Sequence, residues 1–148
     1  MKAGTRGTTR SPAKLYALIF GAVMTVAGII GFFYNSTFTS DSSVRDDVLG
    51  ILSVNGWHNV VHIATGLLGI LAARTLTSAR TYCLLFGIVY LVVCVWGFAV
   101  GNDGSILGIV PVNTADDILH LLLAAGGFAA YAASAPGRAA HGARPAVS

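Results

Sequence analysis

Four long stretches of this chain contain no charged side chain, and they constrain the fold more than any motif does. They are residues 15–40, 48–73, 81–102 and 118–137. Each holds about 20 predominantly apolar residues, enough for a helix to cross a hydrocarbon core of ~30 Å. A soluble helical bundle would instead carry charges along the outer face of its helices. Since 55% of the residues are hydrophobic and only 10% are charged, the sequence predicts an all-α membrane protein with four transmembrane helices.

The chain also repeats itself. Residues 16–32 recur 66 positions later as 82–98. The identical pairs are Tyr16/Tyr82, Leu18/Leu84, Phe20/Phe86, Gly21/Gly87, Val23/Val89, Val26/Val92, Gly31/Gly97 and Phe32/Phe98. A second set recurs 58 positions later: Val54/Val112, Asn55/Asn113, His62/His120 and Gly69/Gly127. We therefore predict two tandem helical hairpins, 15–73 and 81–135, with eight extra residues in the loop of the first.

The segments outside these hairpins are short and polar. Residues 1–13 are basic and are predicted to be disordered, and residues 136–148 are predicted to form a flexible tail. The transmembrane domain then occupies residues 14–135. Its first helix is longer than the apolar core of a signal peptide and matches an internal segment, so we expect it to be retained.

The placement of charges predicts the orientation. Basic residues gather at the N-terminus, in the loop 74–80 and in the C-terminal tail, whereas all acidic residues lie in or beside the other two loops. Only Arg45 departs from this pattern. The positive-inside bias places both termini in the cytoplasm of a multi-pass plasma-membrane protein. The net charge of +3 therefore indicates orientation in a lipid bilayer, and no nucleic-acid partner is expected.

Two local patterns predict helix starts on the outer side. Ser43 and Asp46 have the spacing of a capping box, and apolar residues follow at helical intervals up to Leu52. We expect a short surface helix there. Thr114 and Asp117 have the same spacing at the start of the fourth transmembrane helix.

Small residues follow one face of each predicted helix. Helices in lipid associate where small side chains let the backbones approach closely. The predicted packing positions are Gly21, Gly28, Gly66, Gly69, Gly87, Gly97 and Gly127. These faces are expected to meet, with the Leu, Ile, Val and Phe positions facing lipid.

One polar cluster near the outer boundary can carry chemistry. His58 and His62 lie four residues apart, on one face of the second helix, and Asp116 and His120 occupy the corresponding positions of the fourth. Asn55, Asn59, Asn113 and Asp117 complete a polar ring at the same end. Because ionisable groups inside a membrane are costly and face the bundle interior, such a cluster is a candidate site.

Several interpretations of this cluster stay open. The polar groups can simply hydrogen-bond between helices and cap helix N-termini. His58, His62, Asp116 and His120 can instead bind Zn²⁺ or another divalent metal. His62 and His120 can also serve as the two axial ligands of a haem. A proton- or solute-handling site is a fourth interpretation. The sequence contains no nucleophile–base pair or nucleotide-binding fingerprint, so no enzymatic activity is expected.

The run from Val54 to Arg74, with its Asn…His-Asn-x-x-His-x-x-x-Gly pattern, resembles a bacterial family. Gly87 to Tyr90 and the segment from Val112 to His120 extend the likeness. The family is domain-of-unknown-function family 4383, small four-helix membrane proteins found mainly in actinobacteria. The resemblance covers about residues 14–135, although Gly56 stands where the family often has Pro. It implies the four-helix topology and carries no settled activity.

We expect a non-enzymatic accessory or scaffold subunit that packs against itself or another membrane protein. Short loops, the lack of a soluble domain and the glycine-rich helix faces favour this role. A metal- or haem-binding module at the outer end is the first alternative. A small transporter or channel is the second, with Tyr90 as its prominent polar residue at mid-depth.

Overall fold

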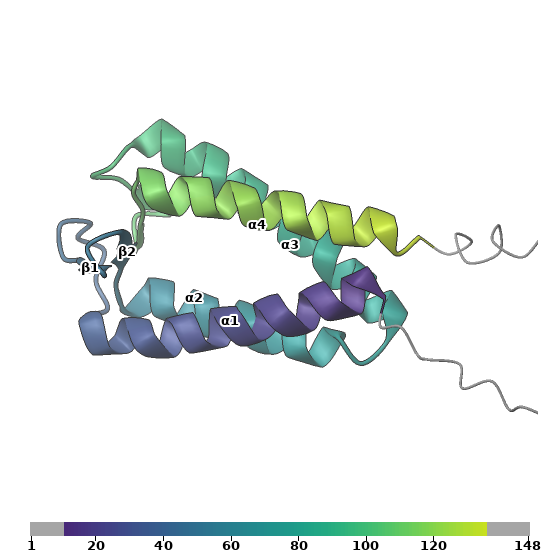
Figure 1. The fold of residues 1–148 in the computed structure, drawn as a ribbon. Helices are drawn as coiled ribbons and strands as arrows, with labels where there is room; N and C mark the ends of the chain where they lie inside the picture. Colours follow the sequence, from purple (N-terminus) through teal and green to yellow (C-terminus); the bar gives the residue numbers. More distant parts are fainter. Residues whose placement is uncertain (1–10, 136–148) are drawn as a thin grey trace, which may run out of the picture.

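The computed structural model describes residues 11–135 and is mainly helical. It contains four helices: α1 (Pro12–Tyr34), α2 (Gly56–Ala72), α3 (Leu76–Val100) and α4 (Thr114–Ala133). Helices α1 and α2 form one antiparallel pair, and α3 and α4 form a second pair that packs across the first (Figure 1). The described termini and the α2–α3 link lie at one end of the bundle, the terminal end, and small β-hairpins lie at the other, the β end.

A polar side chain caps the N-terminus of each helix. The caps are Ser11, Asn55, Thr75 and Asn113, and each side chain accepts a hydrogen bond from the backbone N–H three residues later. Helix α1 therefore begins at Pro12, so the last two residues of the segment predicted to be disordered are helical. Residues 1–10 of that segment and the predicted tail 136–148 lie outside the described residues.

The β end carries two small sheets. It contains no helix over residues 43–52, although the sequence pattern predicts one there. Strands β1 (Asp46–Val48) and β2 (Leu52–Val54) form one antiparallel hairpin, and β3 (Ser105–Ile106) and β4 (Val110–Pro111) form another. The predicted surface helix over 43–52 is therefore wrong. Its supposed cap, Ser43, donates its hydroxyl hydrogen bond to Asp41 instead.

Both hairpins turn through left-handed residues. Leu49 and Gly50 have φ of 56° and 70°, and Leu107 and Gly108 have φ of 55° and 74°. The three residues Leu49-Gly50-Ile51 recur in the sequence as Leu107-Gly108-Ile109. A backbone hydrogen bond of 3.0 Å from Ile51 N to Val48 O closes the first turn. Although the apolar residues of this segment have helical spacing, the positive φ angles of Leu49 and Gly50 are incompatible with a right-handed helix.

The two halves differ in the connection that precedes each hairpin. The first half has a long segment between the end of α1 at Tyr34 and the start of β1 at Asp46, whereas α3 ends at Val100 and β3 begins at Ser105. The extra residues of the first half therefore precede its β-hairpin. This corrects the expectation that a surface helix accounts for them.

Leu49 is a residue whose replacement should stabilise the fold. It is 78% exposed and adopts a backbone conformation that costs a non-glycine residue about 1–2 kcal/mol. Asn tolerates this conformation better than Leu does. The Leu49→Asn variant is therefore expected to raise the free energy of unfolding in detergent by about 0.5–1 kcal/mol. The control is Ile51→Asn, an exposed apolar position without positive φ, which should give no gain; equal effects would contradict the argument.

Small residues bring α1 and α2 into close contact. Gly21 and Gly66 face each other so closely that a Cβ on Gly21 would lie 2.8 Å from the Gly66 carbonyl oxygen. In the other pair, a Cβ on Gly127 would lie 2.9 Å from the carbonyl oxygen of Cys83. Backbone proximity, rather than large interlocking side chains, therefore sets the spacing within each helix pair.

The two cysteines, Cys83 and Cys94, are buried on α3 and free.

Tyrosines join the two helix pairs to each other. The hydroxyl of Tyr16 on α1 donates to the Leu123 carbonyl on α4, and that of Tyr82 on α3 donates to the Thr65 carbonyl on α2. About two turns further along the same two helices, the hydroxyl of Tyr90 on α3 contacts the sulfur of Met24 on α1 at 3.3 Å. These contacts lie along the interface that leads from the terminal end toward the β end.

Candidate functional site

The polar residues at the β end first serve to tie the two halves together. Asn55 caps α2 and its side-chain amide donates to the carbonyl of Ile109, at 2.7 Å. Asn113 caps α4 and its amide donates to the carbonyl of Ile51, at 2.8 Å. Each asparagine thus caps its own helix and binds the β-hairpin of the other half. Both are used structurally.

Asp116 has a similar structural role. Its Oδ2 accepts a hydrogen bond from the backbone N–H of Asn113 and another from that of Ser53, each at 3.0 Å. The first completes a capping box between Asn113 and Asp116, one residue earlier than the predicted box of Thr114 and Asp117. The second crosses to β2 in the other half.

Asn59 and Asp117 pack against glycines. The position of a Cβ on Gly31 would collide with Oδ1 of Asn59, and that of a Cβ on Gly97 with Oδ1 of Asp117. The Asn59 amide donates to the carbonyl of Asn35 at 2.8 Å. Both Oδ1 atoms are buried and have no hydrogen-bond partner among the described residues. These side chains lie within their own helix pairs, away from the shared interface.

The three histidines of the described region come together. One ligand atom from each of His58, His62 and His120 can be chosen so that all three lie within 4.8 Å of one another. The rings of His58 and His62 are 4.5 Å apart between centroids, in an edge-to-face arrangement, and those of His58 and His120 are 6.3 Å apart. Asp116 lines the same cavity but is not part of this group of three. The structure therefore brings together three of the four predicted metal ligands.

Neighbouring groups determine which nitrogens are free. Nδ1 of His58 lies 2.8 Å from the carbonyl oxygen of Ser53, and since a carbonyl only accepts, Nδ1 carries the proton. Nε2 of His58 is then left with its lone pair. A metal-binding histidine is commonly held in this way, by a backbone carbonyl on its other nitrogen. Ser53 was not expected from the sequence, because its contact depends on how β2 returns toward α2.

His120 lacks such a partner. It is 4% exposed, and its Nδ1 is buried with no hydrogen bond among the described residues. Leaving a buried polar atom without a partner costs about 1–3 kcal/mol. The Tyr90 ring lies edge-on to the imidazole, with centroids 5.3 Å apart. A bound metal ion would give Nδ1 of His120 the partner that it lacks among the described residues.

The cavity beside these rings is small. Its volume is about 160 Å³, and Met24, Val54 and Leu123 line it together with the histidines. In a tetrahedral Zn²⁺ site with bonds of 2.0–2.1 Å, neighbouring ligand nitrogens lie about 3.4 Å apart. The histidine nitrogens lie within 4.8 Å of one another, so small rotations of the rings would bring them to this distance. The space corresponds to a few water molecules at about 30 Å³ each, which suits one ion and leaves no room for a haem macrocycle. The geometry therefore favours a single metal ion over haem.

Comparison with known proteins places the chain in one family. The sequence matches the family described as a domain of unknown function (DUF4383) over residues 14–133. The chain belongs to the DUF4383 family. No curated protein and no solved structure matches the chain. The match begins two residues inside α1 and runs to the end of α4, so that it includes both β-hairpins. Its description names no activity.

Proposed function

We propose that this protein is a non-enzymatic, multi-pass membrane protein that binds one divalent metal ion near the outer surface. The observation that carries the metal proposal is the convergence of His58, His62 and His120 on one small buried cavity. Neutral imidazoles are good ligands for Zn²⁺ and for other first-row divalent metals. The contact that holds Nδ1 of His58 at the Ser53 carbonyl and the unpartnered Nδ1 of His120 support this role.

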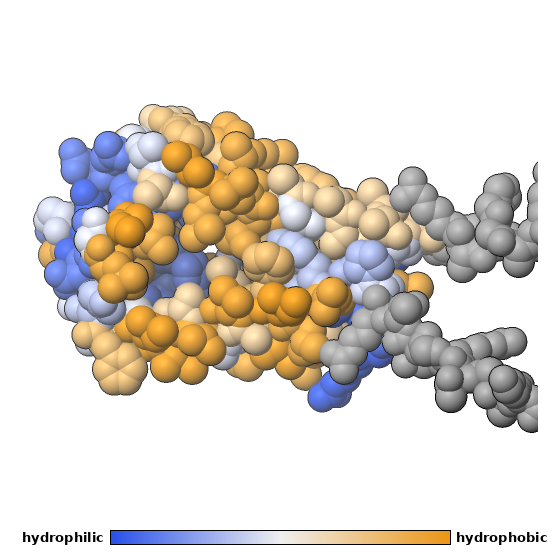
Figure 2. All heavy atoms as spheres, in the orientation of Figure 1, coloured by the Kyte–Doolittle hydropathy of each residue, from blue (hydrophilic) through white to orange (hydrophobic). Residues whose placement is uncertain are grey.

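Embedding in a membrane is supported by the outer faces of the helices. Helices α1 and α3 are long and apolar enough to cross a bilayer by length and composition. Helix α2 has 17 residues, about 25 Å at 1.5 Å per residue, which suits a span that ends slightly inside the boundary. Figure 2 shows hydrophobic side chains over the helices and hydrophilic ones at the β end. Large apolar residues on all four helices are exposed, which fits contact with lipid.

The two ends of the bundle differ in charge, which supports the proposed orientation. Arg74 and Arg80 lie near the terminal end, whereas all six acidic residues lie at the β end or in its loops. Arg45, the one basic residue that departs from the pattern, forms an ion pair with Asp103 at 3.1 Å. The positive-inside bias then favours cytoplasmic termini and an external β end.

A tandem duplication is also part of the proposal. Equivalent residues make reciprocal contacts: Asn55 and Asn113 bind opposite hairpins, and Tyr16 and Tyr82 bind opposite helices. An accessory role is compatible with this scheme, since a metal site that joins α2 to α4 would stiffen the outer end of a scaffold. Packing against a second copy or another membrane protein stays a prediction. The alternative of a small transporter or channel stays a prediction as well.

Metal binding is tested with protein purified from membranes in mild detergent. We expect one Zn²⁺ per chain by elemental analysis after dialysis against micromolar Zn²⁺. His120→Ala removes a direct ligand and should weaken the affinity by at least about tenfold in chelator competition, since loss of a group that only supports a ligand already costs about tenfold or more. The matched control is Asp117→Ala, at a buried polar residue of the same helix that is not part of the group of three histidines, which should leave the affinity unchanged. Wild-type protein without stoichiometric metal, or equal affinity in both variants, would refute the proposal.

A further inference from the structure

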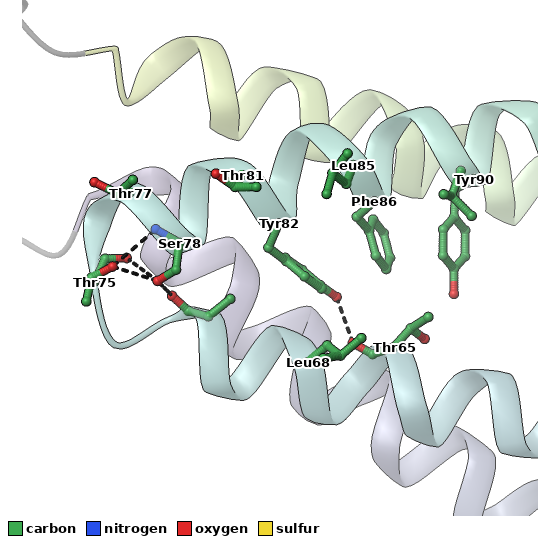
Figure 3. A pocket seen from close by; sticks show the side chains of 12 residues that line it. Thr65, Leu68, Thr75, Thr77, Ser78, Thr81, Tyr82, Leu85, Phe86 and Tyr90 are labelled. Carbon is green, nitrogen blue, oxygen red and sulfur yellow. Dashed lines mark hydrogen bonds between the residues drawn. The ribbon is translucent and has the colours of Figure 1, made fainter.

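A groove runs between α2 and α3, toward the terminal end and away from the histidines. It has a volume of about 650 Å³ and an almost entirely apolar lining. Tyr82, Phe86 and Tyr90 project from α3 across the groove toward α2 (Figure 3). Phe86 and Tyr90 are stacked, with centroids 4.1 Å apart, and Tyr82 is anchored by its hydrogen bond to the Thr65 carbonyl. This aromatic row gives the groove a fixed wall.

Hydroxyl groups mark one mouth of the groove. Thr75, Thr77, Ser78 and Thr81 line it near the start of α3, whereas its far end is bounded by Val89 and Tyr90. From Thr77 to Tyr90 the helix rises about 20 Å, somewhat more than the ~15 Å of hydrocarbon in one leaflet. The groove thus has a polar mouth and an apolar interior of the length of a lipid chain.

An arginine lies beside this mouth. Arg80 lines an adjoining recess of about 350 Å³, and Thr77, Thr81 and Leu85 line both the recess and the groove. Its guanidinium carbon lies 4.6 Å from the centre of the Tyr131 ring on α4, which holds the group in place. The Nε atom is buried and has no hydrogen-bond partner among the described residues.

Arg80 has no acidic side chain to pair with. All six acidic residues of the sequence belong to the loops and helix start at the β end. A positively charged, planar guanidinium without an ion-pair partner among the described residues is suited to a phosphate, which it can bind through two parallel hydrogen bonds. The threonine hydroxyls next to it can donate as well.

The equivalent interface between α1 and α4 is closed, which makes the groove specific to one side. There the backbone N–H of Ala13 donates to the Ser134 hydroxyl at 2.8 Å, in the interior. The Tyr16 ring lies against Gly126, so that a Cβ on this glycine would be 2.9 Å from the ring edge.

We propose that the groove binds one anionic phospholipid of the inner leaflet. Its phosphate lies at Arg80 and the hydroxyls of Thr77 and Thr81, and one acyl chain fills the groove along Tyr82 and Phe86. Positively charged recesses between helices on the cytoplasmic side are suited to anionic headgroups. The proposal rests on the proposed membrane embedding but not on the metal site, which lies beyond Tyr90 on the side toward the β end.

The test uses full-length protein reconstituted in phosphatidylcholine vesicles with or without phosphatidylglycerol. After mild extraction, native mass spectrometry counts the lipids retained by each chain. We expect one phosphatidylglycerol per chain, retained roughly tenfold in preference to phosphatidylcholine. Arg80→Gln should remove the preference, whereas Arg74→Gln, which removes an exposed charge from the same end, should keep it. Ala72→Phe, which fills the groove, should reduce retention of both lipids.

Three results would overturn the proposal. They are a wild-type protein without preference for phosphatidylglycerol, an Arg80→Gln variant that keeps the preference, and inorganic phosphate protecting against heat as well as phosphatidylglycerol does. The last would indicate a free-anion site. If Arg80→Gln fails to fold, the proposal is tested by the lipid preference of the wild-type protein and by the lipid retention of Ala72→Phe. Zn²⁺ binding, measured on the same samples, reports separately on the metal proposal.

Discussion

The Asp116→Ala variant is expected to lose about 3 kcal/mol of unfolding free energy. The substitution leaves the N–H of Ser53, a residue 1% exposed, without an acceptor, which costs about 2 kcal/mol. It also removes the carboxylate that closes the capping box of α4, worth about 1 kcal/mol. Equilibrium unfolding in mixed micelles measures the loss. Because the Ser53 contact crosses between the halves, the β end should also become more accessible to proteases.

Asp117→Ala is the matched control. Asp117 is the next residue, is also buried, and has an Oδ1 without a hydrogen-bond partner in the described region. Its removal should therefore cost about 1 kcal/mol or less. Equal losses in the two variants would show that burial of a carboxyl group, rather than the bond to Ser53, explains the effect of Asp116→Ala.

The Gly66→Ala variant should separate α1 from α2. An added Cβ would lie 2.5 Å from the backbone nitrogen of Thr25 and 2.6 Å from the carbonyl oxygen of Gly21. Backbone atoms cannot move aside as the end of a side chain can, so we expect the steric overlap to cost about 4 kcal/mol of unfolding free energy. The higher helix propensity of Ala than of Gly offsets ~1 kcal/mol of this cost. The net loss of about 3 kcal/mol is measurable in the same unfolding experiment.

Gly126→Ala tests whether the backbone contact is responsible. This glycine also lies inside a helix, but the nearest atoms to its added Cβ belong to the Tyr16 side chain, with Cε2 at 2.9 Å, and not to backbone. Its expected change is within about 1 kcal/mol of zero, because the gain in propensity offsets a small strain. A large loss for Gly126→Ala with none for Gly66→Ala would contradict the proposed role of Gly66 in helix packing.

The helices could be predicted from the sequence because their causes are local. Apolar stretches end where polar caps stand, and Asn55, expected as a cap, does cap α2. The box at α4 was misplaced by one residue, since Asn113 and Thr114 are both suitable caps. The deciding contact is the bond from the Asn113 N–H to Asp116.

The β-hairpins were missed for a different reason. Val48, Leu49 and Leu52 have the spacing of a helix face, and Leu is a poor residue for a left-handed turn. The signal that could have revealed the turn was the repetition of Leu49-Gly50-Ile51 as Leu107-Gly108-Ile109. A glycine at the same place in two loops suggests positive φ in both.

The sequence by itself determined the four apolar helices, their order and the face on which each histidine lies, because hydrophobic length and helical period are properties of single segments. Only the tertiary structure decided which polar groups meet. Asp116 has the same helical position as His58 but is taken by the backbone of the other half, while His58, His62 and His120 are left facing one cavity. The groove lined by α2 and α3 likewise depends on the separation of these two helices. Such distances arise from the packing of helix on helix and of hairpin on helix, which no single segment encodes.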